Sequence, residues 1–285
     1  MNGRRITMAV GKARVAAGGL AFLAAISAAP SRALDTTVFK ASYVISVGGI
    51  VVGHATAESR FSDSGYVASI TGSTSGLTRI VSDASARLSG TGRISGARVL
   101  PSSYSLETRE NGFATHVSMA MRSGTITDLV AVPRLVAAAD RVPITRRHKT
   151  NIVDPLGAFI VPIDRPGTPV GRVVCDRTVK VFDGWTRFDV QLYYKGTKAV
   201  DGSADMYAGR VIVCGARYVP VAGHRSQGSV KELADNQRME IWLVPLNNTR
   251  ILVPYRLLIG TRVGDLMIYA TRFSTDGNQQ RASAD

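Results

Sequence analysis

Residues 173–194, VVCDRTVKVFDGWTRFDVQLYY, decide the fold class of this chain. The stretch holds two runs rich in β-branched and aromatic residues, separated by Asp183-Gly184. An Asp-Gly pair between two such runs is a strong signal for a β-hairpin. In the second run every other residue from Phe188 to Tyr194 is apolar, which places the apolar side chains on one face of a strand. The stretch therefore predicts two paired, half-buried antiparallel strands.

The same pattern recurs along most of the chain. Residues 39–47 alternate in the same way, and Asn111-Gly112 is a second strong hairpin signal. Further strands are predicted at residues 54–61, 66–70, 104–106, 113–117, 126–132, 206–218, 238–244, 251–260 and 266–273. Strands at this spacing, joined by tight turns, indicate an all-β protein.

Residues 154–161 are the exception to this pattern. Asp154 suits the N-cap of a helix and Pro155 its first position, whereas Gly157 and Pro162 keep that helix short. We therefore expect a single all-β domain of antiparallel strands, a curved open sheet or half-barrel, with one short helix near residues 154–161.

The first 33 residues have the order of a secretory signal peptide. Residues 1–14 hold four basic and no acidic residues, residues 15–29 are uncharged and mostly apolar, and small residues follow. We expect cleavage between Ala33 and Leu34, with Ala28 as a second candidate position. The alternative is a membrane anchor, but the uncharged run is shorter than the roughly 20 residues that span a bilayer. The mature protein is therefore expected in the periplasm and not as an integral membrane protein.

Removal of this segment changes the charge of the chain. It takes away five positive charges and no negative one, so the formal net charge falls from +14 to +9. We expect residues 34–273 to form the β-rich domain and residues 274–285 a disordered polar tail. Outside the cytoplasm a basic surface meets lipid head groups and wall polymers, so no nucleic acid partner is expected. The alternative is a solvated basic surface that aids solubility.

Two cysteines, Cys175 and Cys214, are predicted to form a disulfide, because an exported protein meets oxidising conditions. Cys175 falls in the run that enters the Asp183-Gly184 hairpin and Cys214 in a later strand, so the bond is expected to join two strands. Two buried free thiols are the alternative. A metal site is not expected, because no Cys-X-X-Cys and no neighbouring pair of histidines supplies the other ligands.

No motif for catalysis or cofactor binding stands out. The histidines have no second histidine at a spacing that pairs metal ligands; they are His54, His116, His148 and His224. Residues 72–76, GSTSG, are similar to a nucleophile elbow, but their centre is Thr74 and no helix is expected after them. We therefore expect no enzyme, no cofactor and no metal.

Large aromatic side chains are the candidates for lining a cavity. They are Trp185, Tyr193, Tyr194, Trp242 and Tyr255. The alternative is ordinary packing in the core and on the sheet, which is the commoner role of such residues.

Short motifs in both halves are similar to those of a known family. They lie at residues 43–53, 154–158, 207–209, 213–214, 218–224, 239–245 and 253–256. Together they resemble the exported bacterial domain-of-unknown-function family 3108, over most of residues 38–273. The resemblance implies an exported β-rich protein of Gram-negative bacteria. It implies no activity and no functional residues, because none is established for the family.

Two classes of function remain open. The first is a binding module that holds a lipid or another apolar or amphipathic cell-envelope molecule in the concave face of the sheet. The second is a non-catalytic structural or interaction protein that supports the envelope through its surface. An apolar cavity of several hundred Å³ favours the first class. A filled interior with a conspicuous surface patch favours the second.

Overall fold

The structure, a computed structural model, describes residues 36–62, 65–76, 83–164, 171–202, 206–226, 228–246 and 249–275. The chain divides into two units, Met1–Ala33 and Leu34–Asp285, and every described residue belongs to the second unit. The predicted signal peptide and its cleavage site therefore lie outside the described residues. So do residues 276–285 of the predicted tail, while residues 274 and 275 continue the last strand.

The described residues form one antiparallel sheet of fourteen strands, and the fold class predicted from the sequence is confirmed. The strands are β1 (Thr37–Val47), β2 (Ile50–Phe61), β3 (Gly65–Thr74), β4 (Ala84–Ser95), β5 (Arg98–Glu110), β6 (Phe113–Arg122), β7 (Thr125–Val132), β8 (Val161–Pro162), β9 (Arg177–Phe182), β10 (Arg187–Val200), β11 (Gly209–Ala222), β12 (Met239–Pro245), β13 (Ile251–Ile259) and β14 (Leu266–Thr275).

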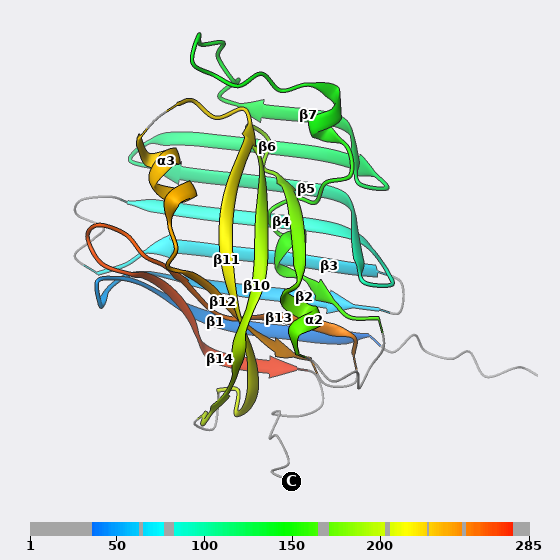
Figure 1. The fold of residues 1–285 in the computed structure, drawn as a ribbon, viewed down its shortest axis with the longest axis vertical. Coiled ribbons are helices and arrows are strands. Elements are labelled where there is room, and N and C mark those ends of the chain that lie inside the picture. Colours follow the sequence, from blue (N-terminus) through cyan, green and yellow to red (C-terminus); the bar gives the residue numbers. More distant parts are fainter. Residues whose placement is uncertain are drawn as a thin grey trace, which may run out of the picture. The chain divides into compact units, whose positions relative to one another are not determined.

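The sheet consists of two meanders joined along one ladder (Figure 1). Its strand order is β7-β6-β5-β4-β3-β2-β1-β14-β13-β12-β11-β10-β9, with the short β8 paired to β13. Consecutive strands are neighbours within each meander, whereas β1 and β14 come from the two ends of the domain. The sheet is open, and β7 and β9 are its edge strands.

The predicted hairpins are present. Asn111 and Gly112 both have positive φ, 48° and 86°, as expected for the two-residue turn between β5 and β6. Between β9 and β10, one carboxylate oxygen of Asp183 accepts the N–H groups of Trp185 and Thr186 at 2.8 and 2.6 Å. These bonds fix the tight turn from which β10 runs back along β9.

The short helix predicted near residues 154–161 is a 3-10 turn, η2 (Gly157–Phe159). The described residues also contain three short helices that were not predicted: η1 (Arg146–Lys149), α2 (Arg172–Cys175) and α3 (Gly228–Asp235). Each has at most eight residues. Segments this short hold too few turns for a helical pattern to stand out in the sequence.

The disulfide between Cys175 and Cys214 is formed, with the two Cα atoms 5.4 Å apart. The prediction that it joins two strands is wrong, because Cys175 is the last residue of α2 and only Cys214 lies in a strand, β11. The apolar run Val173-Val174-Cys175 turns into a helix just before β9 begins. The disulfide therefore links this helix to the sheet. Both cysteines belong to a second, smaller cluster of buried apolar residues, separate from the main core.

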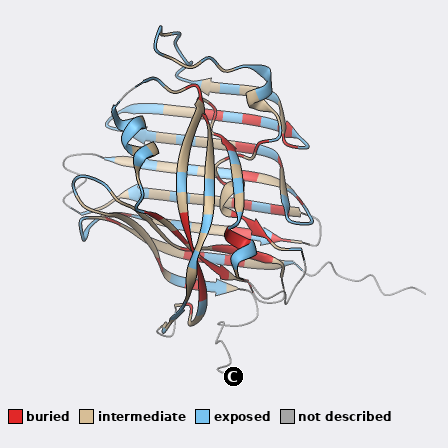
Figure 2. Ribbon diagram, in the orientation of Figure 1, coloured by how far each residue is buried: buried red, intermediate tan, exposed pale blue. Residues whose placement is uncertain are grey.

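The main core lies where the second meander crosses the first. In Figure 1, β9, β10 and β11 run across β2–β6, and Figure 2 shows buried residues where the two layers meet. Phe182 of β9 belongs to the same core as Val117 of β6, and both are fully buried. Gly184, in the turn after β9, lies directly against Val117, because a Cβ atom there would approach two of its methyl groups to 2.8 Å.

The long connection between β7 and β9 links the two open edges. The N–H of Ile152 donates to Gly124, in the turn before β7, at 3.0 Å. The next residue, Val153, donates to Lys180 at 2.8 Å and accepts from Phe182 at 3.0 Å. One short segment thus touches both ends of the sheet. We call residues 151–162, which include η2 and β8, the bridging segment.

Candidate functional site

Small residues occupy one row on the inner face of the first meander. Ala55 of β2, Gly72 of β3 and Ala86 of β4 are direct neighbours in one row across three strands. Ala57 lies one inward position along β2. Because side chains on the inner face of a curved sheet normally fill the space beneath it, this row leaves a hollow.

The hollow is an apolar cavity of about 290 Å³. Its floor is the inner face of β1–β4, its sides are β13 and β14, and the bridging segment covers it. The larger lining side chains are Phe39, Tyr43, Ile45, Phe61, Ile70, Leu88, Leu156, Phe159, Ile160, Val253, Leu257 and Ile268. This volume is at the lower end of small-molecule pockets, which begin at roughly 300 Å³.

The bridging segment holds its covering residues in place through Asp154. One carboxylate oxygen of this fully buried residue accepts the N–H groups of Leu156 and Gly157, both at 2.9 Å. Burial raises the pKa of Asp154 to about 6. The carboxylate thereby fixes the turn that presents Leu156 and Phe159 to the cavity.

The cavity is closed at one end and accessible at the other. Phe39 and Phe61, at the end near the bridging segment, are buried. Tyr43, Ala55 and Ala86, nearer the last residues of β1 and β3, are only half-buried although they face inward. The cavity is therefore more exposed at that end of these strands.

Polar groups are scarce in the cavity wall. Among the described residues that line it, only Tyr43 and Ser59 carry a polar side-chain group. The Tyr43 hydroxyl already donates to the carbonyl of Pro254 at 2.7 Å, and burial raises its pKa. Water in such a space finds few hydrogen-bond partners, so the cavity suits a hydrocarbon chain or an apolar ring.

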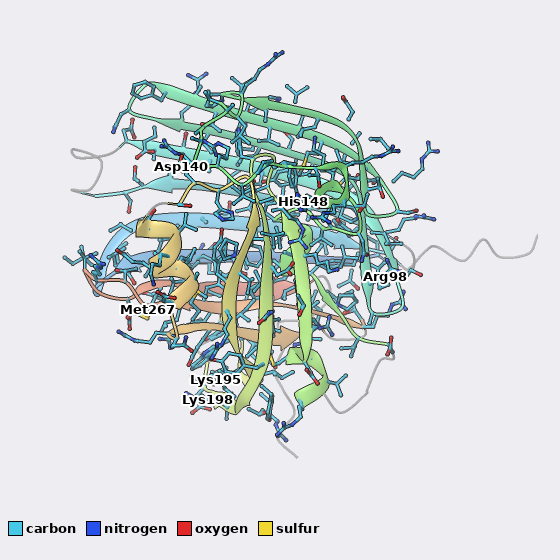
Figure 3. The ribbon with its side chains drawn as sticks, turned by 45° about the horizontal axis from the view of Figure 1, so that its top comes forward. Arg98, Asp140, His148, Lys195, Lys198 and Met267 are labelled. Carbon is cyan, nitrogen blue, oxygen red and sulfur yellow. A yellow bond between two sulfur atoms is a disulfide. The ribbon has the colours of Figure 1, made fainter. Side chains whose placement is uncertain are left out.

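None of the aromatic residues proposed from the sequence lines this cavity. Trp185 donates from its indole to the carbonyl of Pro133 at 2.8 Å, and Tyr194 and Tyr255 pack in the two cores. The ring of Trp242 has Lys198 4.7 Å and Arg256 4.8 Å from its centre. Lys198 lies near the end of β10, away from Arg98 in Figure 3.

The sequence contained a different signal for the cavity. Inward positions of predicted strands normally carry large apolar residues, whereas here they carry Ala55, Ala57, Gly72 and Ala86. A run of small residues on the inner face of neighbouring strands means either close packing of another layer or an empty space. The alternation alone did not distinguish these two outcomes.

The histidines are not brought together by the fold. His54 lies on β2, His116 on β6, His148 in η1 and His224 after β11. Within the part of the chain that the structure describes, no three His, Cys, Asp or Glu residues are grouped so as to hold a metal ion. No helix among the described residues has the length and apolar character needed to cross a membrane.

Comparison with known families shows to which family the chain belongs. The model of the family described as "Protein of unknown function (DUF3108)" matches residues 42–271. The chain belongs to the DUF3108 family. This DUF3108 chain is also similar to a solved structure described as a beta-barrel-like protein of domain of unknown function DUF1849, from Brucella abortus. The similarity has a TM-score of 0.46 and 9% identity, and covers 85% of this chain and 99% of the other. No curated protein matches this DUF3108 chain.

Proposed function

We propose that this protein is a binding module that holds the apolar part of a lipid or another cell-envelope molecule in its inner cavity. The observation that carries the proposal is the cavity of about 290 Å³, formed by small inward residues and lined almost wholly by apolar side chains. A protein core is normally packed without space of this size. The more exposed end of the cavity, near the last residues of β1 and β3, gives a ligand a way in.

Export to the periplasm of a Gram-negative bacterium is part of the same proposal. It is supported by the basic, apolar and small-residue order of residues 1–33. The Cys175–Cys214 disulfide also supports it, because such bonds persist in oxidising compartments.

The experiment fills the cavity without disturbing the surface. The variant Ala57→Ile adds a branched side chain inside the cavity, and the control Ala120→Ile adds the same atoms at an exposed position on β6. Binding of the uncharged dye N-phenyl-1-naphthylamine is followed by its fluorescence. Native mass spectrometry of protein purified from its own periplasm shows whether a molecule is retained.

We expect dye binding by the native protein and by Ala120→Ile, and at least a tenfold loss in Ala57→Ile. A retained molecule should likewise disappear from Ala57→Ile alone. If Ala57→Ile folds with an unchanged thermal midpoint and binds the dye like the native protein, the cavity is not the binding site and the proposal fails.

A further inference from the structure

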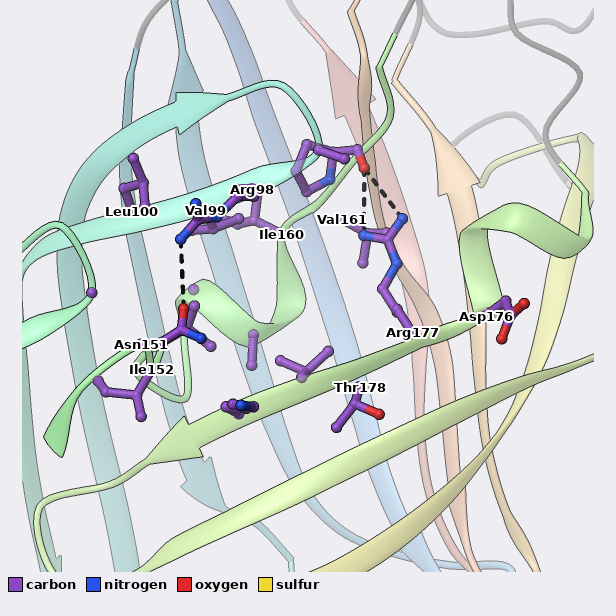
Figure 4. A pocket seen from close by; sticks show the side chains of 18 of the residues that line it. Arg98, Val99, Leu100, Asn151, Ile152, Ile160, Val161, Asp176, Arg177 and Thr178 are labelled. Carbon is purple, nitrogen blue, oxygen red and sulfur yellow. Dashed lines mark hydrogen bonds between the residues drawn. The ribbon is translucent and has the colours of Figure 1, made fainter. Parts of the chain in front are cut away.

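A second hollow lies on the other side of the bridging segment (Figure 4). It has a volume of about 400 Å³ and is separate from the apolar cavity, although Ile160 lines both. Its walls are the start of β5, the bridging segment, and β9 with the end of α2. We call it the basic pocket, because three cationic side chains line it.

These cations are Arg98 of β5 and Arg177 and Lys180 of β9. None of them forms an ion pair with any residue of the described ranges. One acidic residue, Asp176, also lines the pocket. Figure 4 shows its carboxylate directed away from the guanidinium of Arg177. The lining therefore has an excess of positive charge.

Arg177 is the least satisfied of these cations. Its two terminal nitrogens donate to the carbonyl of Pro162 only at 3.4 Å, and its Nε is buried without a hydrogen-bond partner. Burial lowers the pKa of Arg177, although Asp164 opposes the effect. A half-buried guanidinium with weak bonds is unfavourable unless an anion completes its hydrogen bonds.

The pocket also has an apolar surface. Val99 and Leu100 of β5, Ile160 and Val161 of the bridging segment, and Val179 of β9 line it. In Figure 4, Ile160 and Val161 lie between Arg98 and Arg177. A ligand that fits this arrangement carries an oxyanion and a short apolar portion.

We infer that the basic pocket binds a phosphate group attached to an apolar chain, with Arg177 and Arg98 as its principal donors. The guanidinium fork of Arg177 pairs with two phosphate oxygens, and its buried Nε gains the partner it lacks. The apolar side chains contact the first carbons of the chain. This site is distinct from the apolar cavity and does not depend on the function proposed for that cavity.

The test uses hexyl phosphate, inorganic phosphate and hexanol as probes, with affinities from isothermal titration calorimetry. Arg177→Gln removes the central charge. Arg98→Gln removes an exposed one whose only side-chain bond in the described chain is a 3.5 Å contact with the exposed Asn151, so the fold does not depend on it. Arg217→Gln, at an exposed position on β11, is the matched control. All variants are also made in the Ala57→Ile background, so that binding in the apolar cavity does not contribute.

We expect hexyl phosphate to bind at least tenfold more tightly than inorganic phosphate, and hexanol to bind with no dependence on either arginine. Arg177→Gln should weaken hexyl phosphate binding at least tenfold, Arg98→Gln severalfold, and Arg217→Gln not at all. Unchanged binding in both Arg177→Gln and Arg98→Gln would overturn the inference. Equal affinities for inorganic and hexyl phosphate would overturn its apolar part. Dye uptake by the arginine variants without Ala57→Ile reports the apolar cavity, so failure of one site is distinguishable from failure of the other.

Discussion

Asp154 and Tyr66 face each other across Gly157, each with a buried oxygen that has no hydrogen-bond partner. A Cβ atom at Gly157 would lie 3.0 Å from Oδ2 of Asp154 and 3.3 Å from the hydroxyl of Tyr66. Burial, followed by the charge of Asp154, raises the pKa of Tyr66. When Asp154 is protonated it can donate to a neighbouring oxygen, whereas its ionised form can only accept. The fold of the bridging segment is therefore more stable when Asp154 is neutral than when it is ionised.

This relationship predicts a pH-dependent stability. The pKa of Asp154 is about 6 in the folded protein and about 3.9 in an unfolded chain. A folded pKa above the unfolded one gives a stabilising contribution that is complete below about pH 4 and is lost as the pH rises through about 6. Asp154→Asn keeps the shape and removes the charge. We expect it to raise the free energy of unfolding at about pH 8, by up to about 3 kcal/mol, and to match the native protein at about pH 4.

Urea unfolding at several pH values measures this difference. Asp128→Asn, at an exposed position on β7, is the control and should change little at any pH. Asp154→Ala should destabilise at every pH, because it also loses the bonds to Leu156 and Gly157. A difference between Asp154→Asn and the native protein that does not vary with pH would contradict the expectation.

Gly184 and Gly112 offer a matched pair of turn substitutions. Both have positive φ, 107° and 86°, but only Gly184 lies against another side chain, that of Val117. Gly112→Ala should therefore cost about 1 kcal/mol through backbone strain alone. Gly184→Ala should cost about 1–3 kcal/mol more, because the added methyl overlaps Val117 in a packed core.

A double-mutant cycle separates strain from overlap. Val117→Ala makes room at the contact, so it should recover part of the loss in Gly184→Ala and none of the loss in Gly112→Ala. Additive effects for Gly184→Ala and Val117→Ala would show that the contact between the two layers does not matter for stability.

The disulfide should be important for stability and resistant to reduction. Cys175 and Cys214 are fully buried and 39 residues apart. A loop of this length corresponds to about 4 kcal/mol in the chain-entropy model, which is roughly 10 °C in thermal midpoint for a domain of this size. Cys214→Ser should show this decrease by calorimetry.

Reduction should require unfolding. We expect dithiothreitol to leave the native bond intact, and to reduce it once urea has unfolded the protein. Rapid alkylation of both thiols in native protein treated with dithiothreitol alone would mean that α2 detaches readily from β11.

Processing is the fourth prediction. The mature chain should begin at Leu34, because Ser31 and Ala33 are the small residues before the expected cut. Ala33→Trp should block cleavage at this position, whereas Ala28→Trp should not. N-terminal sequencing of the osmotic-shock fraction measures the outcome. Intact chains beginning at Met1 in the membrane fraction of cells making the native protein would contradict it.

The strands could be predicted from the sequence because the two patterns that specify them, alternation of apolar residues and turn-forming pairs, are local. Alternation in residues 39–47 and the pairs Asn111-Gly112 and Asp183-Gly184 act over a few residues, and the structure has a strand or turn at each. Sequence alone did not predict that β1 pairs with β14, since this ladder joins residues more than two hundred positions apart. The helix that ends at Cys175 was missed because four residues are too few for a helical pattern.

The candidate sites were harder to predict than the fold. The apolar cavity depends on the lack of large side chains at inward positions such as Ala57 and Gly72, whereas large aromatic residues are the more conspicuous candidates in the sequence. The basic pocket gathers Arg98 of the first meander and Arg177 of the second, and the bridging segment lies beside both in its lining. No pattern of spacing in the sequence indicates that Arg98 and Arg177 lie near each other.

The ladder between β1 and β14 can form only after the last strand of the domain has been synthesised. β1 is the first strand to be synthesised, yet one of its two neighbours is the last. Until residues 266–275 have been synthesised, the two meanders are separate sheets. Together these sheets have four edge strands, β7, β1, β13 and β9, whereas the finished sheet has only two. Unpaired edges recruit strands from other chains. A nascent or truncated chain that stops short of β14 is therefore far more prone to aggregate than its loss of ten residues suggests.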